Sequence, residues 1–264
     1  MHALYAPVAR LMESVAADVV LPRYQNLAAD EVSEKAADDF VTIADRESEE
    51  RLEAGLAAIL PEAGVVGEEA SAADPRILEG VGCGVNWIID PIDGTGNFAA
   101  GRPPFGIMVA LVEDGEILAG WIFDPLARRM CHAAKGKGAW IDGERIIARE
   151  SGEAQPIAAL AIKYMLPDVR ADILARAQGR FQTVDIPNCA AEQYPRIALG
   201  QNDIAIFERA LPWDHAPGAL FLNEAGGRLS HRDGTPYLVG DGKTGLLGAS
   251  SPRLWDSAAE ILFS

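Results

Sequence analysis

The sequence predicts a layered α/β fold, and three observations support this prediction. Apolar residues recur every three or four positions over residues 3–21, which is typical of an amphipathic helix. Residues 106–147 alternate apolar strand-like segments with turn signals such as Asp142-Gly143, which predicts an antiparallel meander. In the second half, strand-like and helix-like segments alternate, and this order favours packed layers. A chain of 264 residues, 49% of them hydrophobic, can bury the core that such layers require.

The remaining elements of the first half follow in order. The first helix is expected to end near Pro22, because proline interrupts helical hydrogen bonding. A second helix is expected over Asp45–Leu60. Its solvent-facing side is expected to carry Ser48, Glu49, Glu50 and Glu53. Short strands at Val65–Val66 and Val85–Ile89 each lead to acidic residues, and the second is expected to end abruptly at Asp90-Pro91.

The second half is expected to supply four strands and four helices. The strands are predicted at Ile157–Ile162, Phe181–Val184, Asp203–Phe207 and Leu246–Ala249. The helices are predicted at Val169–Ala177, Ala190–Leu199, Asp214–Glu224 and Pro252–Leu262. We expect residues 1–264 to form a single domain, with a soft subdomain boundary near residues 150–156.

Composition narrows the classes of partner. The formal charge of -16 disfavours binding to nucleic acid or to an anionic membrane surface. It would also repel a phosphorylated substrate unless cations lay between the two. Three separated cysteines signal neither a disulfide framework nor a zinc site, and they are expected to be buried thiols in a reducing cytoplasm. The N-terminal residues lack a basic stretch followed by an apolar one, so no leader peptide is expected.

The segment from Trp87 to Thr95, WIIDPIDGT, carries the clearest chemical signal. It places Asp90 and Asp93 three residues apart at the end of a buried strand, with the Ile92 carbonyl between them. Three oxygen ligands could therefore converge from four consecutive residues, and such ligands suit a hard cation such as Mg²⁺. The backbone N–H groups of residues 94–96 could form an anion-binding turn beside it.

Further acids are candidates for the same site. Glu68-Glu69 follows a short strand and a glycine, while Asp214 is expected to cap a helix. Taken singly, a DG pair is usually a turn, an EE pair is usually solvated, and such an aspartate is usually only an N-cap. The order in which these motifs occur together indicates a metal site much more specifically than any one of them does.

The order of these motifs resembles that of the inositol monophosphatase family. The resemblance spans most of the chain. It is carried by Asp39–Asp45 (DFVTIAD), then GEE, WIIDPIDGT, LPWDHAPG and EAGG, together with the Lys135–Ala139 hairpin (KGKGA). The resemblance implies a five-layer α-β-α-β-α sandwich of the inositol monophosphatase/fructose-1,6-bisphosphatase type. It also implies lithium-sensitive, Mg²⁺-dependent hydrolysis of a small phosphate monoester by a cytoplasmic homodimer that holds two to three Mg²⁺ ions.

Residue roles carry over by motif position. The metal ligands would be the carboxylates of Glu68, Asp90, Asp93 and Asp214 and the Ile92 carbonyl, with Asp45 holding a further ion through water. Asp90 would be shared by two ions, one also bound by Glu68 and Ile92, the other by Asp93 and Asp214. Thr95 and Glu68 would orient the attacking water, which makes Glu68, Thr95 and Asp90 the expected catalytic residues. Substrate contacts are expected at Asp93, Gly94, Thr95, Ala190 and Asp214.

The leaving group of the substrate is less clearly indicated. Phe207 stands where the family commonly has a glutamate that contacts inositol, and Glu208 is one position further along the predicted strand. The segment Asn188–Tyr194 is bulkier than the small residues usual there. Inositol monophosphate or a related sugar phosphate is the first expectation. Histidinol phosphate and fructose 1,6-bisphosphate are alternatives. A 3′-phosphoadenosine 5′-phosphate substrate ranks last because the acidic composition indicates no basic pocket.

Other readings remain open from the sequence. A non-catalytic metal-binding homologue would keep the fold and lose turnover, and an interaction protein would use the acidic surface only for solubility. Lys35 is interpreted as a surface lysine. His215 is interpreted as solvent-facing or locally packed. The apolar segment Gly106–Ile122 could be a dimer surface or core.

Overall fold

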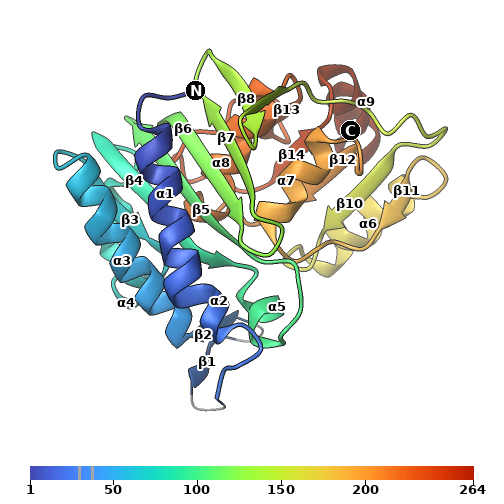
Figure 1. The fold of residues 1–264 in the computed structure, drawn as a ribbon. Helices are drawn as coiled ribbons and strands as arrows, with labels where there is room; N and C mark the ends of the chain where they lie inside the picture. Colours follow the sequence, from blue (N-terminus) through green and yellow to red (C-terminus); the bar gives the residue numbers. More distant parts are fainter. Residues whose placement is uncertain (29–30, 37–38) are drawn as a thin grey trace.

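The computed structural model describes residues 1–28, 31–36 and 39–264, and the side chains of residues 34–39 lie outside that description. Five layers follow one another: a helical layer, a seven-stranded sheet, a second helical layer, a five-stranded sheet and a third helical layer (Figure 1). The five-layer α-β-α-β-α arrangement expected from the sequence is therefore confirmed.

The first helical layer consists of two long helical segments. One comprises α1 (Tyr5–Val15), a π-helical turn (Ala16–Val20) and α2 (Leu21–Arg23); the other is α3 (Ile43–Ile59). Their apolar faces pack against Trp87, Val109 and Trp121 of the first sheet. The first segment continues past Pro22 for one residue, to Arg23, so it ends close to the predicted position. Between these segments, β1 (Val32–Ala36) and β2 (Asp39–Thr42) form an antiparallel hairpin.

The prediction that Ser48 and Glu49 face solvent is wrong. Both are buried, whereas Glu50 and Glu53 are exposed as expected. The polar residues of α3 thus lie on two faces, one exposed and one buried. Glu49, on the buried face, contacts the short helix that follows the third strand. This arrangement explains why helical periodicity alone misplaced them.

The first sheet has the order β3-β4-β5-β6-β7-β8-β9. Its strands are β3 (Gly64–Gly67), β4 (Val85–Asp93), β5 (Gly106–Glu113), β6 (Glu116–Asp124), β7 (Arg129–Ala134), β8 (Gly138–Ile141) and β9 (Glu144–Ile146). Only β3 and β4 pair in parallel, so the predicted antiparallel meander is confirmed. Within the single chain β5 is buried on both faces, so its apolar character is that of core residues. Between β3 and β4 lie α4 (Glu68–Ala73) and a 3-10 helix (Pro75–Gly80), and α5 (Thr95–Ala99) follows β4.

The second sheet has the order β11-β10-β12-β14-β13. Its strands are β10 (Ile157–Ala161), β11 (Gln182–Val184), β12 (Ile204–Phe207), β13 (Arg228–His231) and β14 (Leu246–Ala249). The middle helices α7 (Ala190–Ala198) and α8 (Pro212–Glu224) lie between the two sheets and share a core with both. The outer helices α6 (Pro167–Ala177) and α9 (Pro252–Phe263) cover the other face (Figure 1).

The predicted elements of the second half are confirmed within one or two residues, and β13 is a strand of this half that the sequence did not predict. Cys131 and Cys189 are buried as expected, but Cys83 is exposed. In the described part of the chain, no helix combines the length and apolar character needed to span a bilayer.

Candidate functional site

The end of β4 is irregular where the two aspartates lie. Asp90 pairs with Met108 and Asp93 with Gly106, and the register shifts between these pairs. Pro91 offers no backbone donor to the neighbouring strand, which favours such a bulge. Within the bulge, Asp90 Oδ1 accepts a 3.1 Å hydrogen bond from the Ile92 N–H. The strand continues to Asp93 instead of ending at Asp90, so both carboxylates are held by the sheet.

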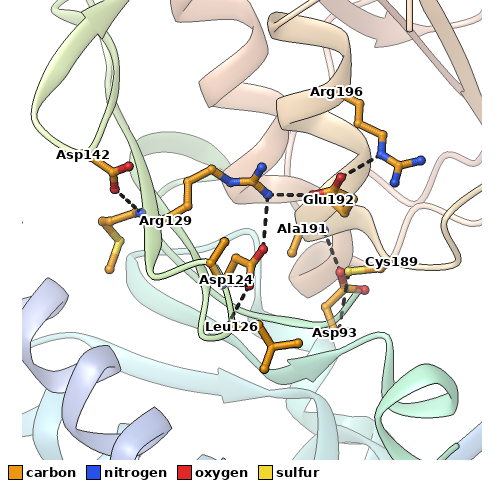
Figure 2. Close-up of polar contacts among 11 residues, drawn as sticks. Asp93, Asp124, Leu126, Arg129, Asp142, Cys189, Ala191, Glu192 and Arg196 are labelled. Atoms are coloured by element: carbon orange, nitrogen blue, oxygen red, sulfur yellow. Dashed lines mark hydrogen bonds and ion pairs between the residues drawn. The ribbon is translucent and has the colours of Figure 1, made fainter. Parts of the chain in front are cut away.

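Asp93 joins this strand to α7. Its Oδ2 accepts a 2.6 Å hydrogen bond from the Ala191 N–H, and Cys189 Sγ lies 3.7 Å from the Asp93 carbonyl oxygen (Figure 2). Because Cys189, the N-cap of α7, makes no side-chain cap bond, Asp93 supplies an acceptor for the helix start. Burial raises the pKa of Asp93 to about 6, although these hydrogen bonds oppose the shift.

The start of α7 is also tied to the first sheet by charge. Arg129 Nη2 lies 2.6 Å from Glu192 and 3.7 Å from Asp124, and Glu192 also pairs with Arg196 at 2.7 Å (Figure 2). These partly buried pairs are well oriented and fix the helix relative to β6 and β7. Ala190 and Ala191 therefore lie on a braced element beside Asp93.

Asp214 completes a compact carboxylate cluster. The prediction that Asp214 is an N-cap is wrong, because Leu211 is the N-cap of α8 and Pro212 begins the helix. Asp214 lies in the first turn of α8, and its carboxylate oxygen is within 4.8 Å of those of Asp90 and Asp93. Burial raises the pKa of Asp90 well above its ordinary value. The negative charges of Glu68, Asp93 and Asp214 raise it further. This oxygen-only set fits a hard divalent cation, which would offset the mutual repulsion.

Glu68 approaches the cluster from the neighbouring strand. Gly67 pairs with Ile89, so Glu68 follows at the level of Asp90 and begins α4. The carboxylate of Glu49 accepts hydrogen bonds from the N–H groups of Glu69 and Ala70, at 2.8 and 2.7 Å. A Cβ atom on Gly67 would lie 2.3 Å from the Glu49 carboxyl carbon, so this support requires glycine there. The sequence offered no signal for Glu49.

Asp45 and Thr95 form an adjoining network. Asp45 Oδ2 accepts hydrogen bonds from the Thr42 N–H at 2.8 Å and hydroxyl at 2.6 Å, which caps α3. The Thr95 hydroxyl lies 3.1 Å from Asp45 Oδ1 and 2.9 Å from the Ile92 carbonyl oxygen. A carbonyl has two lone pairs, so Ile92 retains acceptor capacity for a cation. Burial raises the pKa of Asp45 to about 7.

A cavity of about 480 Å³ opens next to the cluster. It is lined by the predicted site residues Asp93, Gly94, Thr95, Ala190 and Asp214. The structure thus brings the predicted substrate contacts together around one space.

The same cavity is also lined by residues that the sequence did not predict. Its lining includes Lys163, Tyr164, Arg209, Arg102 and Gln193, together with Phe207 and Glu208. The acidic composition gave no evident basic adenylate pocket, yet the fold places Arg102, Lys163 and Arg209 along this cavity, because net charge says nothing about which cations the fold gathers. Lysine or arginine shortly after a strand end was the available signal.

His215 and Glu208 both have partners within the structure. His215 is buried, its Nδ1 lies 2.8 Å from the Tyr194 hydroxyl, and burial lowers its pKa to about 3. It is therefore a locally packed residue and not a solvent-facing one. Glu208 forms an ion pair with Arg232. The side chain of Lys35 lies outside the described residues.

Comparison with known proteins gives consistent matches over nearly the whole chain. The model of the inositol monophosphatase family matches residues 4–262. The Bacillus subtilis protein named inositol-1-monophosphatase is 32% identical over 216 residues, covering 81% of this chain and 80% of that protein. An Aquifex aeolicus protein named fructose-1,6-bisphosphatase/inositol-1-monophosphatase is 29% identical over 244 residues, covering 90% and 89%.

A solved structure agrees in fold. The extragenic suppressor protein SuhB of Bartonella henselae superposes with a TM-score of 0.84 at 22% identity, covering 100% of this chain and 99% of that one. At this identity the likeness concerns the arrangement of the layers.

Proposed function

This chain belongs to the inositol monophosphatase family, and from that premise we propose that it is a Mg²⁺-dependent phosphatase of a small phosphate monoester. The observation that carries the proposal is the cluster of buried Asp90 and Asp93 with half-buried Asp214, whose carboxylate oxygens lie within 4.8 Å of one another. Without a cation such a cluster is costly, because like charges oppose each other at low dielectric. With one, it becomes a binding site for a phosphate.

The ligand set follows from position. Asp90 would contribute to two ions, one also held by Glu68 and the Ile92 carbonyl and the other also held by Asp93 and Asp214. Asp45 would hold a further ion through water. Bound Mg²⁺ would neutralise charge on the transferring phosphoryl group and on the leaving oxygen.

The other roles belong to the chain itself. The backbone N–H groups of residues 94–96 would donate to phosphate oxygens at the cavity floor. The Thr95 hydroxyl, held between Asp45 and Ile92, would orient the attacking water together with Glu68. His215 is neutral at physiological pH and is already hydrogen-bonded, so we assign it no proton transfer. The substrate class is inositol monophosphate or a related sugar phosphate.

The test is phosphate release from inositol 1-phosphate, fructose 1,6-bisphosphate, histidinol phosphate and 3′-phosphoadenosine 5′-phosphate, with Mg²⁺, without it and with added Li⁺. We expect turnover that requires Mg²⁺ and is inhibited by Li⁺. Asp90→Asn should abolish both turnover and calorimetric Mg²⁺ binding, whereas Asp168→Asn, a matched charge removal at an exposed position of α6, should change neither.

Two outcomes would contradict the proposal. Normal Mg²⁺ binding by Asp90→Asn would overturn the central role of this residue. Tight Mg²⁺ binding without turnover on any of the four esters would favour the non-catalytic homologue. We also expect a homodimer in solution, which sedimentation would check.

A further inference from the structure

Two cations of the cavity lining are brought together by the second sheet. β10 and β12 are parallel neighbours, and Ala161 pairs with Phe207. Lys163 and Arg209 each follow two residues after this pair, so both leave the carboxyl edge of the sheet at the same level. Ligands of open α/β sheets bind outside this edge. Both residues line the same cavity as Asp93 and Asp214.

An aromatic ring joins the two cations. Lys163 Nζ lies 5.4 Å from the centroid of the Tyr164 ring, and Arg209 Cζ lies 4.7 Å from it. A guanidinium placed over a ring is oriented by it and still presents its N–H groups to an anion. Lys163, Tyr164 and Arg209 therefore form a cationic wall of the cavity.

No carboxylate in the described part of the chain pairs with Arg209. The adjacent acid, Glu208, is engaged by Arg232. In a chain with a formal charge of -16, an arginine without an acidic partner is conspicuous. The carboxylate cluster does not explain the presence of Arg209, because the negative charge of that cluster is proposed to be balanced by metal ions.

Gln193 supplies an independent sign of a ligand. Its side chain is 2% exposed and lines the same cavity. Neither Nε2 nor Oε1 has a hydrogen-bond partner among the described residues. A buried amide without partners is costly, and a ligand hydroxyl would satisfy it.

We propose that the preferred substrate is a phosphate monoester whose leaving group carries a second phosphate, which binds the cationic wall formed by Lys163, Tyr164 and Arg209. This inference rests on the proposed function, because the scissile phosphate lies at the carboxylate cluster. Gln193 hydrogen-bonds a hydroxyl of the leaving group. An ester with an ammonium group, such as histidinol phosphate, is repelled by the wall, and a monophosphate of a neutral polyol leaves it unused.

The experiment compares matched pairs of esters that differ only in the second phosphate. One pair is fructose 1,6-bisphosphate and fructose 1-phosphate; the other is adenosine 3′,5′-bisphosphate and adenosine 3′-monophosphate. For each pair, the ratio of kcat/KM for the bisphosphate to that for the monophosphate is measured with Mg²⁺. We expect at least one pair to give a ratio of roughly ten or more, as a hydrogen bond to a charged group would provide.

Variants identify the source of the preference. Arg209→Met and Lys163→Gln should each lower the ratio by about tenfold. Arg180→Gln removes an equal charge at an exposed position after α6 and should leave the ratio unchanged. A preference in the sugar pair or in the nucleoside pair identifies which leaving group carries the second phosphate.

Failure of this inference is distinguishable from failure of the proposed function. Mg²⁺-dependent turnover with a ratio near one in both pairs, or a ratio unaffected by Arg209→Met, overturns the inference and leaves the phosphatase assignment intact. If no ester is hydrolysed, calorimetric titration with the same pairs measures the anion site directly. Tighter binding of a bisphosphate that is lost in Arg209→Met then supports the wall, and equal binding overturns it.

Discussion

The carboxylate of Glu49 accepts a 2.8 Å hydrogen bond from the backbone N–H of Glu69, which lies 20 residues further along the chain. This contact fixes the first turn of α4, and that turn begins with Glu68. A buried residue in the first helical layer thus supports a proposed ligand at the edge of the sheet.

Glu49→Ala should therefore weaken Mg²⁺ binding, although it removes none of the proposed ligands. The loss of both bonds to α4 frees Glu68 to move, and changes in residues that orient ligands typically cost about ten- to a hundredfold in metal affinity. Calorimetric titration with Mg²⁺ measures the effect. Glu50→Ala, its exposed neighbour on α3, is the matched control and should bind normally. Equal affinity in both variants would show that Glu68 does not depend on Glu49.

Thr95→Ala should lower kcat by about a hundredfold, within the usual range for a group that assists proton transfer. Its hydroxyl joins Asp45 to the Ile92 carbonyl, and neither partner requires it in order to remain buried. Mg²⁺ affinity should consequently change little. Steady-state kinetics at saturating Mg²⁺, together with calorimetry, separate the two quantities. A large loss of Mg²⁺ affinity with an unchanged kcat would contradict this role.

Thermal stabilisation by Mg²⁺ should increase as the pH rises from 5 to 8. Burial raises the pKa of Asp93 to about 6 and that of Asp45 to about 7, from an ordinary value of 3.8. Between pH 4 and 7 the folded chain therefore holds protons that the unfolded chain has lost, so these groups destabilise the metal-free protein progressively as the pH rises.

Protons also compete with Mg²⁺ for the same carboxylates, so less binding energy is available at pH 5. The measurement is the difference in Tm between samples with Mg²⁺ and with chelator, taken at both pH values. Asp90→Asn is the reference that should show no difference at either pH. An equal gain in Tm at pH 5 and pH 8 in the unaltered protein would contradict the expectation.

Gln193→Leu should raise KM about tenfold for every ester whose leaving group bears hydroxyls, with or without a second phosphate, since it removes a hydrogen bond rather than a charge. Arg209→Met should instead distinguish the two members of a pair. Because leucine keeps the volume and removes a polar group that lacks partners, the Tm should not fall. A lower Tm with unchanged KM would assign Gln193 to the structure alone.

The elements that sequence reasoning predicted best are those whose side chains repeat with one period. The meander over residues 106–147 alternates with turns, and its strands lie where that pattern places them. β13 was missed because Leu229 is its only large apolar side chain. α4 and α5 are too short to show a period.

The candidate site divides in the same way. Asp90, Ile92 and Asp93 are adjacent in sequence, so their convergence could be anticipated. Glu49 looks like any solvated acid of a helix until α4 is placed above it. Lys163 and Arg209 are far apart along the chain, and only the pairing of β10 with β12 brings them to one wall. Contacts that depend on strand order leave no trace in local pattern.

The two sheets therefore divide the work of the proposed enzyme, with α7 and α8 between them. Asp90 and Asp93, the acids proposed to hold Mg²⁺, end a strand of the seven-stranded sheet, whereas the residues of the cationic wall follow strands of the five-stranded one. By this proposal, substitutions after β10 and β12 change which leaving group is accepted without disturbing β4. In the history of such a fold, selectivity can diverge quickly over a reaction centre that stays the same.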